Sequence, residues 1–162
     1  MLRDPSLVPL SRQHQHALAL CVRIRRTLQA GESSPELASA AVWNAEVRDA
    51  FAEEIGAHFA AEEALIFPQA RQFPSLAPLV EDLLTDHAAL RDCFQRAAAG
   101  TLDAAGLVDF ARRLDDHIRK EERQLFEPMQ ELVPPDRLES LGRALEQFLS
   151  ERGAGPSCRI NP

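Results

Sequence analysis

The chain has 162 residues, the length of a single domain that can bury a sizeable core without disulfides. Hydrophobic residues make up 45% and charged residues 27%, which excludes a chain that is disordered throughout. The 25 Asp and Glu residues outnumber the 18 Lys and Arg residues, and the net charge is -7. Because no basic field is available to hold a phosphate backbone, we expect no nucleic-acid partner.

The N-terminal sequence and the cysteines indicate a cytoplasmic protein without a membrane partner. The first ten residues, MLRDPSLVPL, lack the apolar core of a signal peptide, and the strongly apolar stretch 17–22 is far shorter than the ~18 residues of a membrane span. Cys21, Cys93 and Cys158 are odd in number and widely spaced, which indicates neither a disulfide framework nor a thiolate zinc site. We expect Cys21 and Cys93 to be small buried side chains.

Apolar residues recur with the 3.6-residue period of a helix and almost nowhere with the two-residue period of a strand, which predicts an all-α fold. The first helix is expected over 11–30, with Ser11 as a candidate N-cap and Gly31 as its stop. A second helix is expected over 34–67, opening with an N-cap serine and a proline and ending before Pro68.

Two further long helices are expected over 77–99 and 103–127, the latter ending or kinking at Pro128. Four rods with short connections predict an antiparallel up-down four-helix bundle. With an additional short C-terminal helix it forms one domain over 1–151, and the segment 152–162 is expected to be a flexible tail. The short helix carries an apolar side made of Leu138, Leu141, Leu145 and Phe148.

Two HxxxE pairs lie on the apolar faces of the second and fourth helices. Residues four apart share a helical face, so His58 and Glu62 point inward together while Glu63 does not. His117 and Glu121 continue an apolar stripe in the same way. The stripe of the second helix comprises Val47, Phe51, Ile55 and Leu65, and that of the fourth Leu107, Phe110 and Leu114.

The first and third helices each contribute one inward histidine. His87 lies in the middle of the apolar face formed by Leu83, Leu90 and Phe94. In the first helix His14 and His16 cannot share a face, and His14 belongs to the better apolar stripe. Each half of the chain therefore supplies an inward His followed by an HxxxE pair.

Four inward imidazoles and two inward carboxylates are expected to meet in the centre of the bundle. A single buried His is usually a satisfied core residue, but a carboxylate in an apolar core is costly unless a cation or a hydrogen bond satisfies it. Four N and two O ligands suit first-row transition metals, and inward-facing carboxylates with HxxxE or ExxH spacing are how helical bundles assemble dinuclear sites. A metal-free network of buried His–Glu ion pairs is the alternative.

The order of His, HFAAEEALIF, DH and HIRKEERQLF resembles the hemerythrin-like (HHE cation-binding) domain over about 10–129. The resemblance implies a non-haem di-iron centre with a further oxo or hydroxo bridge and an open position for O2, NO or peroxide; Zn and Mn are substitutes. It implies four terminal ligands, His14, His58, His87 and His117, and two bridging ones, Glu62 and Glu121.

One position departs from the family pattern. Oxygen-carrying hemerythrins have an additional His one turn after the third-helix His, and Arg91 stands there in this sequence. The resemblance therefore favours iron binding with sensing of, or response to, O2, NO or redox state over reversible oxygen carriage.

Other functions and other ligands remain open at the level of sequence. A di-iron oxidase or peroxidase is one alternative, although no acid–base pair outside the cluster supports an enzyme, and the chain has no Tyr. A zinc-bound or metal-free interaction bundle is another, with the C-terminal helix as a contact surface, and a homodimer is a further prediction. An assigned ligand could be replaced by His16, Glu63 or Glu122. The carboxylates near the ligands are otherwise expected to be their hydrogen-bond partners or solvated side chains; these are Glu54, Glu63, Asp86 and Glu122.

Overall fold

The computed structural model describes residues 2–29 and 39–153, and every regular element within these ranges is helical. The prediction of an all-α fold is confirmed. No helix of these ranges is both long and apolar enough to cross a membrane. The elements are the 3-10 helix η1 (Pro5–Leu7), α1 (Val8–Gln29), α2 (Ala40–Ala50), the π-helix η2 (Phe51–Ile55), α3 (Gly56–Ala61), the π-helix η3 (Glu62–Ile66), α4 (Phe67–Ala70), α5 (Ala77–Ala98), α6 (Ala104–Lys120), the π-helix η4 (Glu121–Phe126), α7 (Glu127–Leu132) and α8 (Pro135–Gly153).

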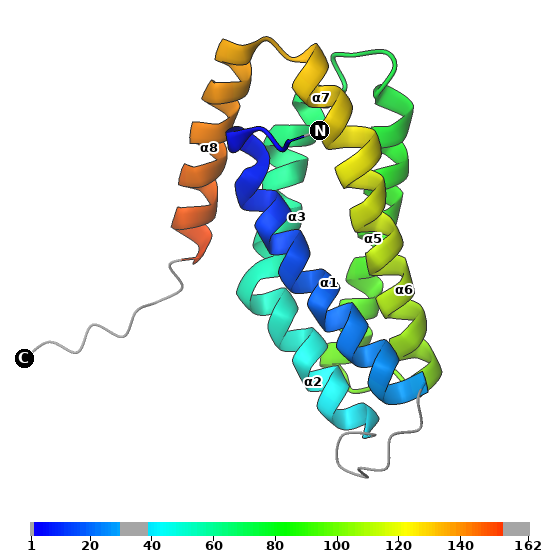
Figure 1. Ribbon diagram of the computed structural model, residues 1–162. Coiled ribbons are helices and arrows are strands. Elements are labelled where there is room, and N and C mark those ends of the chain that lie inside the picture. The colour runs from blue at the N-terminus through cyan, green and yellow to red at the C-terminus, as the bar shows by residue number, and fades with distance from the viewer. Residues whose placement is uncertain (1, 30–38, 154–162) are drawn as a thin grey trace, which may run out of the picture.

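Figure 1 shows four helical rods side by side, with α8 beside them. The first rod is α1, the second runs from α2 to α4, the third is α5, and the fourth runs from α6 to α7. In the figure the chain descends along α1, returns through the second rod, descends along α5 and returns through the fourth. α1 packs mainly against α6, α2 packs mainly against α5, and α6 also contacts α5 and α2.

The first helix begins earlier than expected. The Asp4 carboxylate caps η1 by accepting a hydrogen bond from the backbone N–H of Ser6 (2.9 Å), and α1 follows directly from Val8. The prediction of Ser11 as the N-cap is therefore wrong, because Asp4 followed directly by Pro5 is a stronger signal for the start of a helix. The Ser11 hydroxyl donates instead to Glu122 (2.7 Å).

Two rods continue through prolines at which they were expected to end or kink. The second passes Pro68 and ends at Ala70, and the fourth passes Pro128 and reaches Leu132. A proline cannot donate to the carbonyl four residues before it, and its ring clashes with that carbonyl in a regular α-helix. Both prolines come two residues after a π-helical segment, whose wider turn already departs from that hydrogen-bond pattern. The predicted ends at residues 67 and 127 are corrected accordingly.

The third helix agrees with its predicted range to within one residue, and Gly100 ends it at a φ of 68°, in the left-handed region. Of the two helical cysteines, Cys21 is buried as predicted, whereas Cys93 is only half-buried. Several predicted features lie outside the described residues: Gly31, Ser34 and Pro35 between the first two rods, and Cys158 in the segment that follows α8.

The apolar core divides into two clusters along the rods. One includes Cys21, Phe94 and Phe110, and the other includes Phe67 and Phe126. On every rod the change from one cluster to the other falls at a histidine or next to it, so a polar layer crosses the bundle between two apolar ones. The histidines of this layer are His14, His58, His87 and His117.

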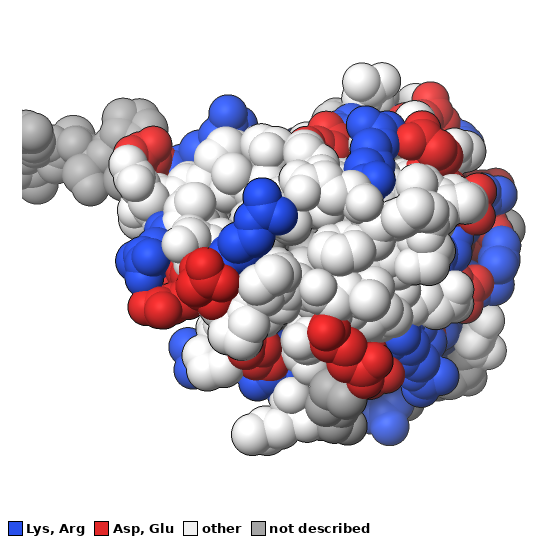
Figure 2. Space-filling view, turned by 90° about the horizontal axis from the view of Figure 1, so that it is seen from above, with Lys and Arg blue, Asp and Glu red and all other residues white. Residues whose placement is uncertain are grey.

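The helix α8 covers η1, α3 and η3. Leu138 and Leu145 are buried in the second apolar cluster, and a Cβ added at Gly142 would lie only 2.7 Å from the Cβ of Ser6. This close approach holds the N-terminal segment against α8. Figure 2 looks down on this end of the molecule, where scattered charged side chains surround a broad uncharged area.

Candidate metal centre

Six titratable side chains from all four rods meet in the polar layer between the two apolar clusters. None is more than 4% exposed, although each can carry a charge. They fall into two histidine pairs, which we call the first pair (His14 and His58) and the second pair (His87 and His117). The carboxylates of Glu62 and Glu121 lie between the pairs.

The first pair faces one oxygen of each carboxylate. His58 Nε2 lies 3.2 Å from Glu62 Oε1, and His14 Nε2 lies 3.2 Å from Glu121 Oε2. The two Nε2 atoms are themselves 3.0 Å apart. These four atoms are close enough to bind one ion.

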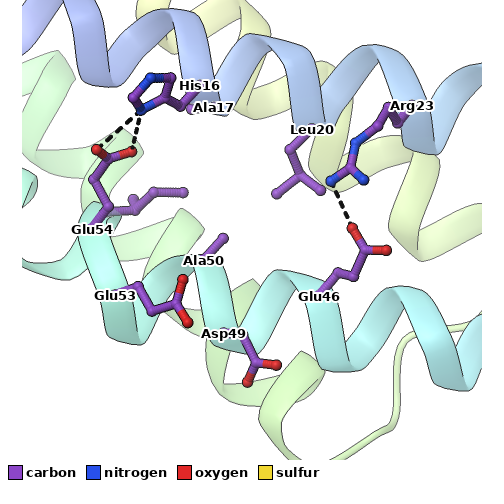
Figure 3. A pocket seen from close by; sticks show the side chains of 10 residues that line it. His16, Ala17, Leu20, Arg23, Glu46, Asp49, Ala50, Glu53 and Glu54 are labelled. Carbon is purple, nitrogen blue, oxygen red and sulfur yellow. Dashed lines mark hydrogen bonds and ion pairs between the residues drawn. The ribbon is translucent and has the colours of Figure 1, made fainter.

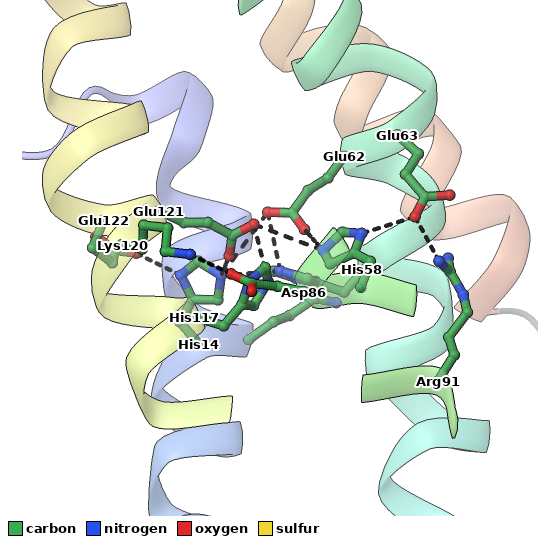
Figure 4. Close-up of polar contacts among 12 residues, drawn as sticks. His14, His58, Glu62, Glu63, Asp86, Arg91, His117, Lys120, Glu121 and Glu122 are labelled. Atoms are coloured by element: carbon green, nitrogen blue, oxygen red, sulfur yellow. Dashed lines mark hydrogen bonds and ion pairs between the residues drawn. The ribbon is translucent and has the colours of Figure 1, made fainter. Parts of the chain in front are cut away.

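The second pair faces the opposite oxygen of the same two carboxylates. His87 Nε2 lies 3.4 Å from Glu62 Oε2, and His117 Nε2 lies 3.2 Å from Glu121 Oε1. A second group that can hold an ion is thereby formed, and both carboxylates belong to both groups. Each Glu thus directs one oxygen to the pair from its own half of the chain and the other to the pair from the other half. Figure 4 shows both carboxylates beside the labelled histidines His14, His58 and His117.

The buried acceptors of this cluster call for a cation. Within the described ranges, both oxygens of Glu62 and of Glu121, and the Nε2 atoms of His87 and His117, are buried without a hydrogen-bond partner. A buried carboxylate is expensive unless cations or hydrogen bonds replace its hydration, and in the described part of the chain only imidazole nitrogens at 3.2 to 3.4 Å oppose the two charges. Metal ions coordinated by these atoms would remove that cost, so the residues present fit a dinuclear metal centre.

The outward Nδ1 atoms of the four histidines are each directed at an acceptor. For the first pair, His14 Nδ1 lies 2.7 Å from Glu122 Oε1 and His58 Nδ1 lies 2.9 Å from Gln13 Oε1. Glu122 also accepts from Arg3 and Ser11. An imidazole that donates through Nδ1 presents the lone pair of Nε2 inward, in the orientation that a metal ligand requires.

For the second pair, His87 Nδ1 lies 2.8 Å from Glu63 Oε1, and His117 Nδ1 lies 3.5 Å from Asp86 Oδ2. Each of these two acceptors also forms an ion pair with a cationic side chain. Arg91 donates to Glu63 (2.7 Å), and Lys120 donates to Asp86 (2.6 Å).

Proton equilibria show how the metal-free chain balances its charges. Burial opposes protonation of His14, but the adjacent carboxylates of Glu121 and Glu122 outweigh it and raise its pKa to about 9. Burial also opposes protonation of His117, but the charge of Glu121 and the hydrogen bond to Asp86 raise its pKa to about 10. Burial alone would raise the pKa of Glu121; the charge of His117 instead holds that pKa well below its usual range. Two imidazolium ions thus balance two carboxylates, and a metal would displace their protons.

Aromatic rings enclose the second pair more tightly than the first. The ring of Phe59 stacks on His87 at a centroid distance of 3.8 Å, and the ring of Phe67 lies 5.3 Å from the same imidazole. The imidazole of His14 stacks on Phe126 at 5.6 Å. These rings keep bulk water from the centre and restrict the rotation of the imidazoles.

The structure brings together all six residues expected at the site, and it places the neighbouring candidates around them. His16 points outward and pairs with Glu54 (3.1 Å), so it lies outside the cluster. Glu63, Glu122 and Asp86 contact imidazoles of the cluster rather than the central space. Sequence reasoning missed Gln13, Arg3 and Lys120, whose roles depend on contacts between rods that a helical face does not reveal.

Comparison with models of protein families shows to which family the chain belongs. The model of the hemerythrin HHE cation-binding domain matches residues 8–128. The chain belongs to this hemerythrin family. No curated protein and no solved structure matches the chain. The matched range contains both histidine pairs and both carboxylates but not α8. Family membership implies that the chain binds cations, in agreement with the two groups of buried His and Glu side chains.

Proposed function

We propose that this chain is a non-haem di-iron protein that binds O2, NO or peroxide at its buried centre and takes part in sensing or responding to them. The proposal includes the antiparallel up-down hemerythrin topology, with α8 as an addition to it. It also keeps the expectations of no nucleic-acid and no membrane partner, and of a homodimer. The six proposed ligands are His14, His58, Glu62, His87, His117 and Glu121.

One observation carries the proposal: two carboxylates each direct separate oxygens to two separate histidine pairs. Glu62 lies 3.2 Å from His58 through Oε1 and 3.4 Å from His87 through Oε2. This division of oxygens between two pairs is the arrangement that bridging carboxylates of a dinuclear site have. Two bridging carboxylates with terminal imidazoles give every buried acceptor a partner.

The donor set favours iron over the alternatives. Six nitrogen and oxygen donors without a thiolate exceed what one tetrahedral zinc ion uses. Carboxylate and imidazole ligands inside a helical bundle suit iron and manganese pairs. An iron pair supplies redox-active metal positions that can accept a small ligand.

The residues around the ligands prepare the site for that chemistry. The Nδ1 acceptors hold each imidazole with its Nε2 inward, and Phe59 and Phe67 exclude water from the second pair. Arg91 stands where oxygen-carrying hemerythrins have an additional His, and it forms an ion pair with Glu63. This substitution leaves fewer protein ligands on the His87 side, which supports a role in sensing or response rather than reversible carriage.

Metal analysis together with spectroscopy tests the function. We expect about two iron ions per chain after anaerobic Fe2+ loading, and charge-transfer absorption in the near-UV and visible range on exposure to O2. NO should also change the spectrum of the reduced protein. His58→Ala should lose about one iron ion, because it removes one ligand of the first pair only.

His16→Ala is the matched control, since it removes the one histidine outside the cluster and should keep the wild-type iron content and spectrum. The proposal would be contradicted if the protein held no iron after loading. It would also be contradicted if the spectrum of the loaded protein changed with neither O2 nor NO. A turnover of peroxide many times the iron content would instead identify an enzyme.

A further inference from the structure

An open cleft on the surface lies between α1 and the paired elements α2 and η2. Its volume is about 340 Å³, and carboxylates dominate its charged lining. Figure 3 shows Asp49 and Glu53 on one wall, the ion pair of His16 with Glu54 at one end and that of Arg23 with Glu46 at the other. Four carboxylates face one Arg and one His, so the cleft carries a net negative charge.

This cleft adjoins a second, inner cavity that reaches the metal centre. The inner cavity measures about 10 Å³, close to the space of one water molecule. Its lining includes His14, His58, His117 and Glu121, and the Nε2 of His117 and both oxygens of Glu121 are buried without hydrogen-bond partners among the described residues. Unpartnered donors and acceptors thus border a space that fits one small ion.

Three residues line both spaces and form the partition between them. Ala17 and Ile55 are buried and apolar, whereas the side chain of Glu54 is 30% exposed. Glu54 therefore borders the open cleft on one side and the inner cavity on the other. The partition consists of one small and one medium-sized apolar side chain next to a carboxylate.

We propose that this acidic cleft is the entry passage by which divalent metal ions reach the buried centre, with Glu54 as the transfer residue at the partition. The proposal rests on the metal-binding function proposed above. Negative charge in a cleft raises the local concentration of cations and the rate of their entry. His16 pairs with Glu54, and Glu53 supplies a further carboxylate on the wall of the cleft.

The rate of metal uptake distinguishes this passage from a general effect of charge. The test mixes metal-free protein with Co2+ at low ionic strength and follows the visible absorption of the bound ion by stopped flow. The double variant Glu53→Gln/Glu54→Gln should load about tenfold more slowly than wild type, with the same final stoichiometry. High salt should reduce the wild-type rate more than that of the variant.

Glu139→Gln/Glu146→Gln is the matched control, because it removes the same charge from exposed positions on α8 and breaks the comparable Glu139–Arg143 ion pair. This control should load at the wild-type rate. Equal rates in the two double variants, with full uptake in both, would overturn the passage while leaving the metal centre intact. A wild-type chain that takes up no Co2+ or Fe2+ would overturn the metal-binding function and the passage with it.

Discussion

The two histidine pairs occupy equivalent positions in the two halves of the chain but lie in different surroundings. The first pair has one carboxylate and one amide as Nδ1 acceptors, Glu122 and Gln13, and both its imidazoles line the inner cavity. The second pair has two carboxylate acceptors, and His87 is fully buried against phenylalanines. His117 of the second pair also lines that cavity, so the two pairs differ mainly in their Nδ1 acceptors and in the aromatic packing of His87. We therefore expect two unequal metal positions, with the weaker one at the first pair.

The largest effect on metal content is expected from a change that acts on both metal positions at once. Glu62→Gln keeps the shape of the side chain but removes the charge that faces both pairs, so both metal positions lose a bridging ligand. We expect the metal content at saturation to fall from about two ions per chain to fewer than one. Elemental analysis after gel filtration measures this content.

Glu63→Gln is the matched control, one residue away and directed at His87 Nδ1 instead of the central space. At saturating metal it should retain both ions. If Glu62→Gln also retained two ions, the bridging role of this carboxylate would be refuted.

An exchange of Nδ1 acceptors should reduce or reverse the inequality of the pairs. A carboxylate partner makes an imidazole a stronger metal ligand than an amide does, and such partners typically change metal affinity 10- to 100-fold. Gln13→Glu should therefore tighten binding of the weaker ion about tenfold, whereas Glu63→Gln should weaken binding at the second pair by a similar factor. Competition with a chromophoric chelator measures both affinities, and shifts in the opposite directions would contradict the assigned inequality.

A smaller effect is expected from pH, and it concerns one histidine of each pair. Folding raises the pKa of His14 to about 9 and that of His117 to about 10, above the unfolded value of 6.5. The stability that they contribute to the metal-free chain is fully present below pH 6.5 and is lost as the pH rises through 9 and 10. We expect the Tm of the metal-free protein to fall by at least about 5 °C between pH 7 and 9.5.

The metal-loaded protein should lack most of this decline, because metal ligation removes both protons. Burial raises the pKa of the Cys21 thiol to about 12, so this residue also destabilises the fold at high pH, but it does so in both forms. The difference between the loaded and metal-free curves isolates the histidines. Parallel curves would show that neither His14 nor His117 exchanges its proton for metal.

Helical periodicity was sufficient to find the central layer of the site. His14, rather than His16, was selected because it shares a face with Leu10 and Ala17, and the structure buries His14 and exposes His16. The same arithmetic grouped each HxxxE pair, because its two members are four positions apart along the helix. The hydrogen-bond partners Gln13 and Lys120 were not predictable in this way, since they lie beside the apolar faces and become partners only when the rods pack.

The π-helical segments mark where periodicity fails. Leu65 was expected on the apolar stripe, but it is only half-buried, while Ile66 and Phe67 are buried. The wider turn of η3 adds one residue and shifts the face by about one position after Glu62. A regular 3.6-residue period cannot anticipate that shift, nor can it anticipate that a helix will continue through Pro68.

The N-terminal segment has a practical consequence for how the protein is handled. Arg3 donates to both the backbone carbonyl and the side chain of Glu122. The Glu122 carboxylate in turn accepts a hydrogen bond from His14 Nδ1. Asp4 is held by Gln130, and Ser6 lies under Gly142 of α8. An affinity tag that replaces or displaces the first few residues would therefore disturb His14, a proposed metal ligand, through two contacts. Purification handles belong after α8, and a preparation tagged at the other end is the wrong one from which to judge the metal content.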